Sequence, residues 1–533
     1  MILYYALTTY HIQCCVLHKL TQKKNEEAIL LLSDIHQNSV AFLSRYKSSN
    51  IFSDVILLPE MEINAHVRKN EARHRSKMSI LNTACKEIKS ALPVNLQNFS
   101  DIYLCPDHFP FGWYILNNKI KYHCFEEGCG VLSDNKFMMS NMKRNKTQYQ
   151  LMDVLGYFGS SDCAVEILAD EKAQIEGYKN SKMTDFSVKR ILQTLSPQEL
   201  KTVLSFFGVT EKVAKSNEKL SLILTQHMAN LGIMSLEEQH LIYKLFADYF
   251  LDKTHIIVKP HPDDIAGRYD EIFCGNATAL PFAMPSELLP YCMDDKLEIA
   301  IAAYSTAVKN LGDFCNRMIC FDQRIMTDFR HIHRYYAVLK ALQFTNSLNS
   351  PIVTNGDELL FDELAQNESL KPNIKNSAEL TDIQGVAVIS DELSETRTID
   401  NICSYLLSLK NDEIIIFLNE NNKHIYFDGI HTEVFKNIRP IFISIKENNK
   451  ITEEVIYVYS TNADVIEKVE NFNLTKELKY TGVTLDIHSI SHSDSEKIKM
   501  LEGVLDATEK RLKEYINNKK KLDEQIEKLS KNK

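Results

Sequence analysis

Short apolar runs that alternate with helical patterns constrain this chain more than any other feature. Residues 2–7 form one apolar run, a helical periodicity follows over residues 12–20, and a second apolar run covers residues 28–32. Because two parallel strands are usually connected by a helix, this pattern predicts an α/β fold with a parallel, helix-covered sheet over residues 1–165.

A second region of the same kind is expected over residues 180–345. A strand is predicted at residues 220–225, and Ser235 with Glu238 forms a Ser-x-x-Glu capping box that begins the next helix. That helix leads into a buried strand at residues 255–258, which the prolines at positions 260 and 262 end. The sequence therefore predicts two Rossmann-like domains.

The composition changes after these two regions. Loops rich in Asn, Ser and Asp over residues 346–380 indicate a boundary, and strand-like runs beyond it predict an accessory α/β region over residues 346–490, with no assigned role. Residues 494–533 place apolar side chains at alternating spacings of three and four, with Thr508 and Lys519 as poor core residues. The tail is either a dimeric coiled coil, which would make a homodimer, or one amphipathic helix docked on its own chain.

Charge and cysteine content exclude several classes of protein. The net charge is 61 − 71 = −10, and general binding to nucleic acid needs a basic surface, so nucleic acid is not an expected partner. The 12 cysteines are scattered over 533 residues, which is typical of reduced thiols in a cytoplasm rather than of a disulfide-linked secreted domain. Cys124 and Cys129 have no second pair at zinc-ligand spacing, so no structural metal is expected.

The N-terminal residues predict a first strand rather than a targeting segment. They contain no basic leader, and Thr8 and Thr9 interrupt the apolar run before the core of a signal peptide can form. No run of about 18 apolar residues occurs, so no membrane-spanning helix is expected. We expect a cytoplasmic protein whose membrane contact, if it has any, is peripheral and at the inner membrane.

Three short polar clusters follow predicted strands, where the doubly wound fold binds its ligands. The first is Glu126-Glu127-Gly128, directly after Phe125. Adjacent acids raise one another's proton affinity, and partial burial can keep one of them ready as a general base near neutral pH. The alternative interpretation is a solvated turn.

The second cluster is Lys259-Pro260-His261-Pro262. A histidine held between two prolines has little backbone freedom, which suits a group that contacts a phosphate or protonates a leaving oxygen. Lys259 adds a local positive charge. The alternative is a structural histidine in a rigid turn.

The third cluster is Ser305-Thr306, where an apolar strand runs into a helical pattern. Hydroxyl groups and free backbone N–H groups at a helix start can bind a phosphate. The alternative is a plain N-cap.

The order and spacing of these clusters resemble the motif set of the bacterial sialyltransferases and polysialyltransferases, which have the two-Rossmann-domain GT-B fold. The resemblance covers roughly residues 1–345 and includes residues 222–226, the capping box at residues 235–238 and Pro-Ser-Glu-Leu at residues 285–288. It implies an inverting transferase that moves sialic acid from CMP-sialic acid to a glycan acceptor. It also implies that no cofactor and no metal ion is required.

On the acceptor side, the resemblance implies that Glu126 takes the proton from the attacking hydroxyl, supported by Glu127 and Gly128. On the donor side, it implies that His261 contacts the departing cytidine monophosphate and that Glu287 binds the ribose hydroxyls. Relatives often have two serines where this chain has Ser305-Thr306. The other donor-binding residues that the resemblance implies are Lys259, Pro262, Ser305 and Thr306.

Two basic clusters lie in the first predicted domain. They can hold an anionic glycan acceptor, or they can be solvated helix faces. The residues concerned are Arg68, Arg73, Arg75, Lys143 and Arg144.

Three alternatives remain open. The first is a GT-B transferase with another donor, such as CMP-Kdo or CDP-glycerol. The second is a zinc deacetylase, because His261-Pro-Asp-Asp264 resembles that family's metal-binding signature, although no His-x-x-His partner follows. The third is a non-catalytic assembly protein, which the accessory region and the tail would suit.

Overall fold

The protein divides into two units. The first unit comprises Met1–Tyr243 and Lys253–Cys320, and the second comprises Lys244–Asp252 and Phe321–Lys533. Each unit is described by itself below. The computed structural model describes residues 1–35, 39–126, 143, 146–170, 182–212, 219–261, 264, 269–273, 275–280, 284–303, 305–321, 329–376, 385–390, 406, 414–418, 436–448, 450–489 and 519.

The first unit begins with a seven-stranded sheet in the order β3-β2-β1-β4-β5-β6-β7, in which every neighbouring pair is parallel. The chain starts in the centre and winds out to one edge before it returns and builds toward the other, as in a Rossmann fold. The strands are β1 (Ile2–Ala6), β2 (Ala28–Ser33), β3 (Asp54–Leu58), β4 (Asp101–Cys105), β5 (Tyr122–Phe125), β6 (Ala164–Ala169) and β7 (Met183–Asp185).

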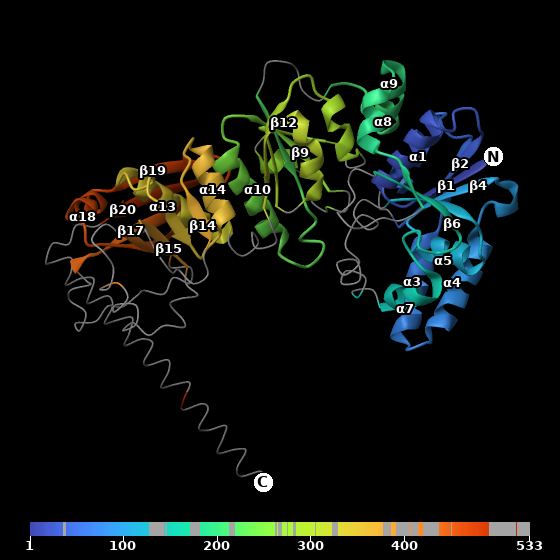
Figure 1. The fold of residues 1–533 in the computed structure, drawn as a ribbon, viewed down its shortest axis with the longest axis horizontal. Helices are drawn as coiled ribbons and strands as arrows, with labels where there is room; N and C mark the ends of the chain where they lie inside the picture. The colour runs from blue at the N-terminus through green and yellow to red at the C-terminus, as the bar shows by residue number, and fades with distance from the viewer. Residues whose placement is uncertain are drawn as a thin grey trace, which may run out of the picture. The chain divides into compact units, whose positions relative to one another are not determined.

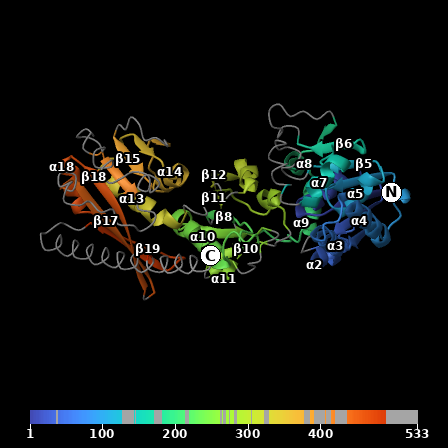
Figure 2. The ribbon, with the colours of Figure 1, turned by 90° about the horizontal axis from the view of Figure 1, so that it is seen from below.

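Helices cover both faces of this sheet (Figure 1). On one face, α1, α8 and α9 pack over Ile2, Tyr4 and Ala6 of β1, whereas Leu3 and Tyr5 face the core beneath α3, α4, α5 and α7. Helices α3 and α4 lie side by side in both views (Figure 1, Figure 2). The helices of this part are α1 (Thr9–Thr21), α2 (Ser39–Ser48), α3 (Glu60–Ala72), α4 (Lys77–Ala91), α5 (Pro110–Asn117), α7 (Lys146–Leu155), α8 (Val188–Thr194) and α9 (Pro197–Phe206), with a short 3-10 turn η1 (Leu96–Asn98).

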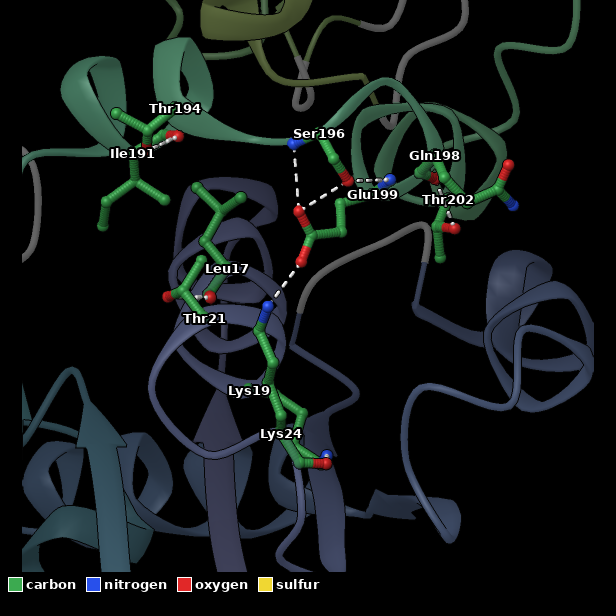
Figure 3. A network of polar contacts seen from close by, with 10 residues as sticks. All are labelled: Leu17, Lys19, Thr21, Lys24, Ile191, Thr194, Ser196, Gln198, Glu199 and Thr202. Atoms are coloured by element: carbon green, nitrogen blue, oxygen red, sulfur yellow. Dashed lines mark hydrogen bonds and ion pairs between the residues drawn. The ribbon is translucent and has the colours of Figure 1, made fainter.

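A polar network fixes the start of α9 against the turn between α1 and β2 (Figure 3). Glu199 accepts from the backbone N–H of Ser196 at 2.9 Å and completes a capping box, while Lys24 Nζ donates to its other oxygen at 2.6 Å. The Lys24 ammonium and the Ser196 donors together lower the pKa of Glu199 to about 2. Helices α8 and α9 follow β7, the last strand of the first sheet, and these contacts hold α9 on the face that α1 covers.

The second sheet of this unit has five parallel strands in the order β10-β9-β8-β11-β12. Its chain order is again the doubly wound one, and its switch point lies between β8 and β11. The strands are β8 (Leu220–Leu224), β9 (His255–Lys259), β10 (Ala277–Ala279), β11 (Leu297–Ala302) and β12 (Cys315–Cys320). The helices that accompany it are α10 (Leu236–Phe250), α11 (Tyr269–Ile272), and the 3-10 helices η3 (Ser286–Tyr291) and η4 (Thr306–Phe314).

The second unit is built on a mixed eight-stranded sheet in the order β14-β13-β15-β16-β18-β17-β20-β19. The strands from β14 to β16 in this order pair in parallel, and those from β16 to β19 pair antiparallel. Helix α13 packs against β16, β17 and β18 (Figure 2). The last two turns of α10 belong to this unit, where Asp248 accepts from the backbone N–H groups of Tyr480 and Thr481. The elements are η5 (Phe329–His331), α13 (Ile332–Phe344), β13 (Ile352–Thr354), α14 (Glu358–Asn367), β14 (Ile374–Asn376), β15 (Val386–Ile389), β16 (Ile414–Leu418), β17 (Ile438–Glu447), β18 (Lys450–Ser460), α18 (Ala463–Glu470), β19 (Asn473–Leu478) and β20 (Val483–Ser489).

The prediction of an α/β chain with two Rossmann-like domains and an accessory α/β region is confirmed by these three sheets. The predicted helix or coiled coil of residues 494–533 lies outside the described residues, apart from Lys519. Over the described part of the chain, none of the helices combines the length and the apolar content that crossing a bilayer requires.

Candidate active site

Glu126 directly follows β5 at the carboxyl end of the first sheet, and only 6% of its surface is exposed. Its backbone N–H donates to Leu168 at 3.0 Å and continues the pairing of β5 with β6. The Tyr10 hydroxyl, in the first turn of α1, donates to its Oε1 atom. Its Oε2 atom is buried and has no hydrogen-bond partner among the residues that the structure describes.

This environment tunes the carboxyl group to neutral pH. Burial raises the pKa of Glu126 to about 7, the hydrogen bond from Tyr10 opposes that rise, and the negative charges of Asp170 and Glu287 add to it. A carboxylate with a pKa near 7 can accept a proton from a substrate and release it to water. Glu126 therefore has the pKa that a general base needs.

Lys259, the last residue of β9, is 5% exposed and provides a buried positive charge at the second sheet. Its Nζ atom donates to the backbone carbonyl of Pro260 at 2.8 Å. Burial lowers the pKa of Lys259 to about 8, and the nearby Glu287 carboxylate acts in the opposite direction. An anionic ligand in contact with this ammonium would relieve the cost of its burial.

Glu287, in η3, connects these two groups electrostatically. Its charge acts on Glu126 and Tyr10 of the first sheet and also on Lys259 of the second. Glu126, Lys259 and Glu287, which lie far apart in the sequence, are therefore brought within electrostatic range of one another.

The turn that carries His261 is held by a buried network. Thr225, just after β8, accepts from the His261 backbone N–H at 2.9 Å and donates to Asp264 at 2.6 Å. Asp264 also accepts from Gln239 at 3.1 Å and from the Tyr269 hydroxyl. Because four groups fix this turn, the backbone position of His261 is set by neighbouring elements and not by the prolines alone.

The His261 imidazole stacks on that of His227, with ring centroids 4.1 Å apart and an angle of 26° between the planes. His227 follows β8, so the two rings come from the ends of neighbouring strands. The Nδ1 atom of His227 is buried and has no hydrogen-bond partner in the described part of the chain. The pair places two imidazoles beside the switch point of the second sheet, where this fold binds ligands.

Ser305 follows β11 on the other side of that switch point. Its hydroxyl accepts from the Ala307 backbone N–H at 3.3 Å and caps η4, which is a 3-10 helix. An N-cap role is therefore present, and phosphate binding by Ser305 stays a prediction. The side chain of Thr306 lies outside the described residues.

The remaining predicted site residues fall into two groups, those that the structure does not describe and those that are exposed. Glu127, Gly128, Pro262 and Arg144 lie outside the described residues, and Lys143 is exposed. The three arginines are exposed on α3 and in the turn after it, and α3 covers the face of the sheet opposite to α1. They are Arg68, Arg73 and Arg75.

Four residues of the site were given no role in sugar transfer by the sequence analysis, although Thr225 lies in the stretch 222–226 and Asp264 in the signature of the deacetylase alternative. Thr225 and Asp264 hold the histidine turn, and Tyr10 and His227 contact Glu126 and His261. The place of Tyr10 and His227 just after β1 and β8 was an available signal, because loops at the carboxyl ends of parallel strands carry ligand contacts. In the described residues, no three His, Cys, Asp or Glu side chains gather as metal ligands, and the absence of a metal requirement stays a prediction.

No protein-family model matches the sequence, and no curated protein does. Solved structures give weak likenesses. The UDP-GlcNAc 2-epimerase from Neisseria meningitidis bound to UDP-GlcNAc is 13% identical, with a TM-score of 0.33, over 58% of this chain and 78% of that chain. The α/β-galactoside α-2,3-sialyltransferase from the luminous marine bacterium Photobacterium phosphoreum is 10% identical, with a TM-score of 0.34, over 71% of this chain and 99% of that chain. The UDP-GlcNAc 2-epimerase from Methanocaldococcus jannaschii in complex with UDP-GlcNAc and UDP is 10% identical, with a TM-score of 0.35, over 61% of this chain and 90% of that chain.

These likenesses are too remote to carry a functional argument. The structural class of this protein is therefore defined by its own sheet order and by its buried polar groups. The chain has two Rossmann-like domains, with a buried carboxylate at the strand ends of the first sheet and a buried ammonium with two stacked imidazoles at those of the second.

Proposed function

We propose that this protein is an inverting GT-B glycosyltransferase that moves sialic acid from CMP-sialic acid to a glycan acceptor. The observation that carries the proposal is Glu126, a buried carboxylate with a pKa of about 7 and one oxygen without a described partner. Glu287 couples it electrostatically to the buried ammonium of Lys259. Inverting transfer of a sugar from a nucleotide is assisted by a base for the acceptor hydroxyl and by a positive charge for the leaving phosphate.

The reaction has one displacement step. A hydroxyl oxygen of the acceptor bonds to the anomeric carbon, and the bond from that carbon to the phosphate oxygen breaks with its electron pair. The hydroxyl proton goes to Glu126, and cytidine monophosphate leaves with the additional negative charge. Lys259 and His261 neutralise that charge or protonate the phosphate oxygen, so no cofactor and no metal enters the step.

The choice of donor rests on the order of the sequence motifs. The acid-acid-glycine cluster, the Lys-Pro-His-Pro turn and the Ser-Thr helix start follow one another as in the bacterial sialyltransferases. An anionic glycan acceptor, a cytoplasmic location at the inner membrane and a homodimer through residues 494–533 are parts of the proposal that rest on the sequence alone.

The proposal is tested by the release of cytidine monophosphate from CMP-sialic acid, with and without glycan acceptors. Wild-type protein should release it, and Glu126→Ala and His261→Ala should not. Glu87→Ala and His255→Ala are matched controls, because Glu87 on α4 pairs with His66 on α3 and His255 lies at the amino end of β9.

The same assay with CMP-Kdo and CDP-glycerol separates the donors. Turnover of one of these instead of CMP-sialic acid would keep the transferase and replace the donor. Unchanged turnover in both the Glu126→Ala and the His261→Ala protein would contradict the proposed site.

A further inference from the structure

Three buried carboxyl groups lie just after strands of the first sheet, and each accepts a hydrogen bond from a tyrosine. Tyr5 donates to Glu60 at 2.5 Å, Tyr122 donates to Asp107 at 2.7 Å, and Tyr10 donates to Glu126. Burial raises the pKa of all three carboxyl groups. The pairs differ in what the second carboxyl oxygen does.

The second oxygens of Glu60 and Asp107 are used within the fold. Glu60 accepts from the Phe111 backbone N–H at 2.7 Å, and Asp107 accepts from the backbone N–H of Phe158 at 2.8 Å. The Oε2 atom of Glu126 has no such partner in the part of the chain that the structure describes. The first two pairs are therefore complete structural contacts, whereas the third leaves one oxygen for a ligand.

Tyr10 is placed rigidly enough to orient this carboxyl group. It lies in the first turn of α1, which a capping box fixes: the His11 N–H donates to Thr8 Oγ1 at 3.3 Å, and the Thr8 N–H donates to His11 Nδ1 at 3.2 Å. Its hydroxyl reaches past the end of β4 to Glu126, because β4 separates β1 from β5 in the sheet. A glutamate carboxyl rotates over a broad range, so a bond to one oxygen decides where the other points.

We infer that Tyr10 is a positioning residue, which holds Oε1 of Glu126 so that Oε2 meets the acceptor hydroxyl, an inference that rests on the proposed function. The phenol acts on Glu126 by donating to it and touches no reacting atom.

The charges around the pair favour this role. Burial first, and then Cys14 and Glu126, raise the pKa of Tyr10 well above its ordinary value, so the phenol remains a donor across the physiological range. Cys14, one turn further along α1, also lies within range of Glu126, and burial keeps its thiol protonated. Asp170 and Glu287 repel the ionised form of Glu126, and the phenol hydrogen bond opposes that repulsion.

The test compares Tyr10→Phe with Tyr122→Phe, a matched control that removes another buried tyrosine–carboxylate bond of the same sheet. The carboxyl carbon of Glu126 is followed by ¹³C NMR in protein labelled at glutamate and is assigned by its loss in Glu126→Gln. Tyr10→Phe should raise the pKa of Glu126 by about one unit and lower kcat about tenfold, with KM for the acceptor unchanged. Tyr122→Phe should change none of these values.

A second substitution tests the sign without removing the ring. Incorporation of 3-fluorotyrosine at position 10 makes the phenol a stronger donor and should lower the pKa of Glu126. A pKa that stays at the wild-type value in both variants overturns the inference, and so does wild-type kcat in Tyr10→Phe. If the wild-type protein transfers no sugar, the proposed function fails, and the titration alone decides whether Tyr10 controls Glu126.

Discussion

The two Rossmann-like sheets have the same winding but carry opposite chemistry at their carboxyl ends. The first presents buried carboxyl groups, of which Glu126 keeps an oxygen without a described partner. The second presents the buried ammonium of Lys259 and the stacked rings of His227 and His261. Since the strand orders match, the difference lies in the few residues after each strand, and the fold divides a buried carboxyl group and a buried ammonium group between its two halves.

The division assigns a separate kinetic effect to each sheet. A residue of the first sheet that removes a proton should affect kcat, because it acts in the transition state. A residue of the second sheet that holds the nucleotide equally in ground and transition states should affect KM for the donor, whereas His261, which can protonate the leaving oxygen, should also affect kcat. Four substitutions or titrations test that separation.

The largest effect is expected for Glu126→Gln, which keeps the shape and removes the base. We expect kcat to fall on the order of 10³-fold, with KM for the donor unchanged. Steady-state kinetics of nucleotide release measures both values, with Glu87→Gln as the control. A rise in KM for the donor without loss of kcat would place Glu126 among the binding residues and would refute the assignment of the proton transfer to the first sheet.

The next effect is expected for Lys259→Met, which removes the buried ammonium but keeps a side chain of similar length. A charge-assisted contact to phosphate contributes about 2 kcal/mol, so KM for the donor should rise about 30-fold. Lys253→Met, an exposed position before β9, is the control. Equal effects of the two substitutions would show that Lys259 does not contact the donor.

The pH dependence of kcat/KM should report both sheets in one curve. Glu126 must be ionised, so the rate should fall about tenfold per pH unit below its pKa of about 7. Lys259 must be protonated, so the rate should fall in the same way above its pKa of about 8. The expected profile is a narrow bell with its maximum between those values.

The bound donor should widen that bell on one side only. The donor phosphate favours the charged form of Lys259, so the upper limb of the kcat profile should lie above that of kcat/KM. Loss of the lower limb in Glu126→Gln would assign that limb to the first sheet. A lower limb that persists in this variant would refute the assignment.

The sequence predicted what depends on local pattern. The apolar runs that became β1, β2, β8 and β9 are long enough to recognise. Lys259 and His261 were singled out at the end of the run that became β9, and Glu126 just after the segment that became β5. In the second unit, β13 and β14 have three residues each, which is too short for a periodicity to appear.

Contacts between distant parts of the chain were beyond such prediction. Tyr10 and Glu126 are 116 positions apart in the sequence, and β4 lies between the strands that precede them. Their hydrogen bond therefore depends on the order of the strands in the sheet. Thr225 and Asp264 likewise meet because β8 and β9 are neighbours. Strand order is decided by tertiary packing, which no single segment encodes.

The smallest effect is expected for His227→Asn, and it tests how the second sheet divides its work between two imidazoles. His227 stacks on His261, and its Nδ1 atom lacks a partner within the described residues, so it can add one hydrogen bond to the donor or orient its neighbour. The loss of a single neutral hydrogen bond should raise KM for the donor about threefold and leave kcat unchanged. His255→Asn should leave both values unchanged. His255 lies at the opposite end of β9 from the expected ligand, and its Nε2 atom is 2.9 Å from Thr278 Oγ1. A fall in kcat in His227→Asn as large as in His261→Asn would mean that both rings of the stacked pair, and not His261 alone, take part in protonating the leaving phosphate oxygen.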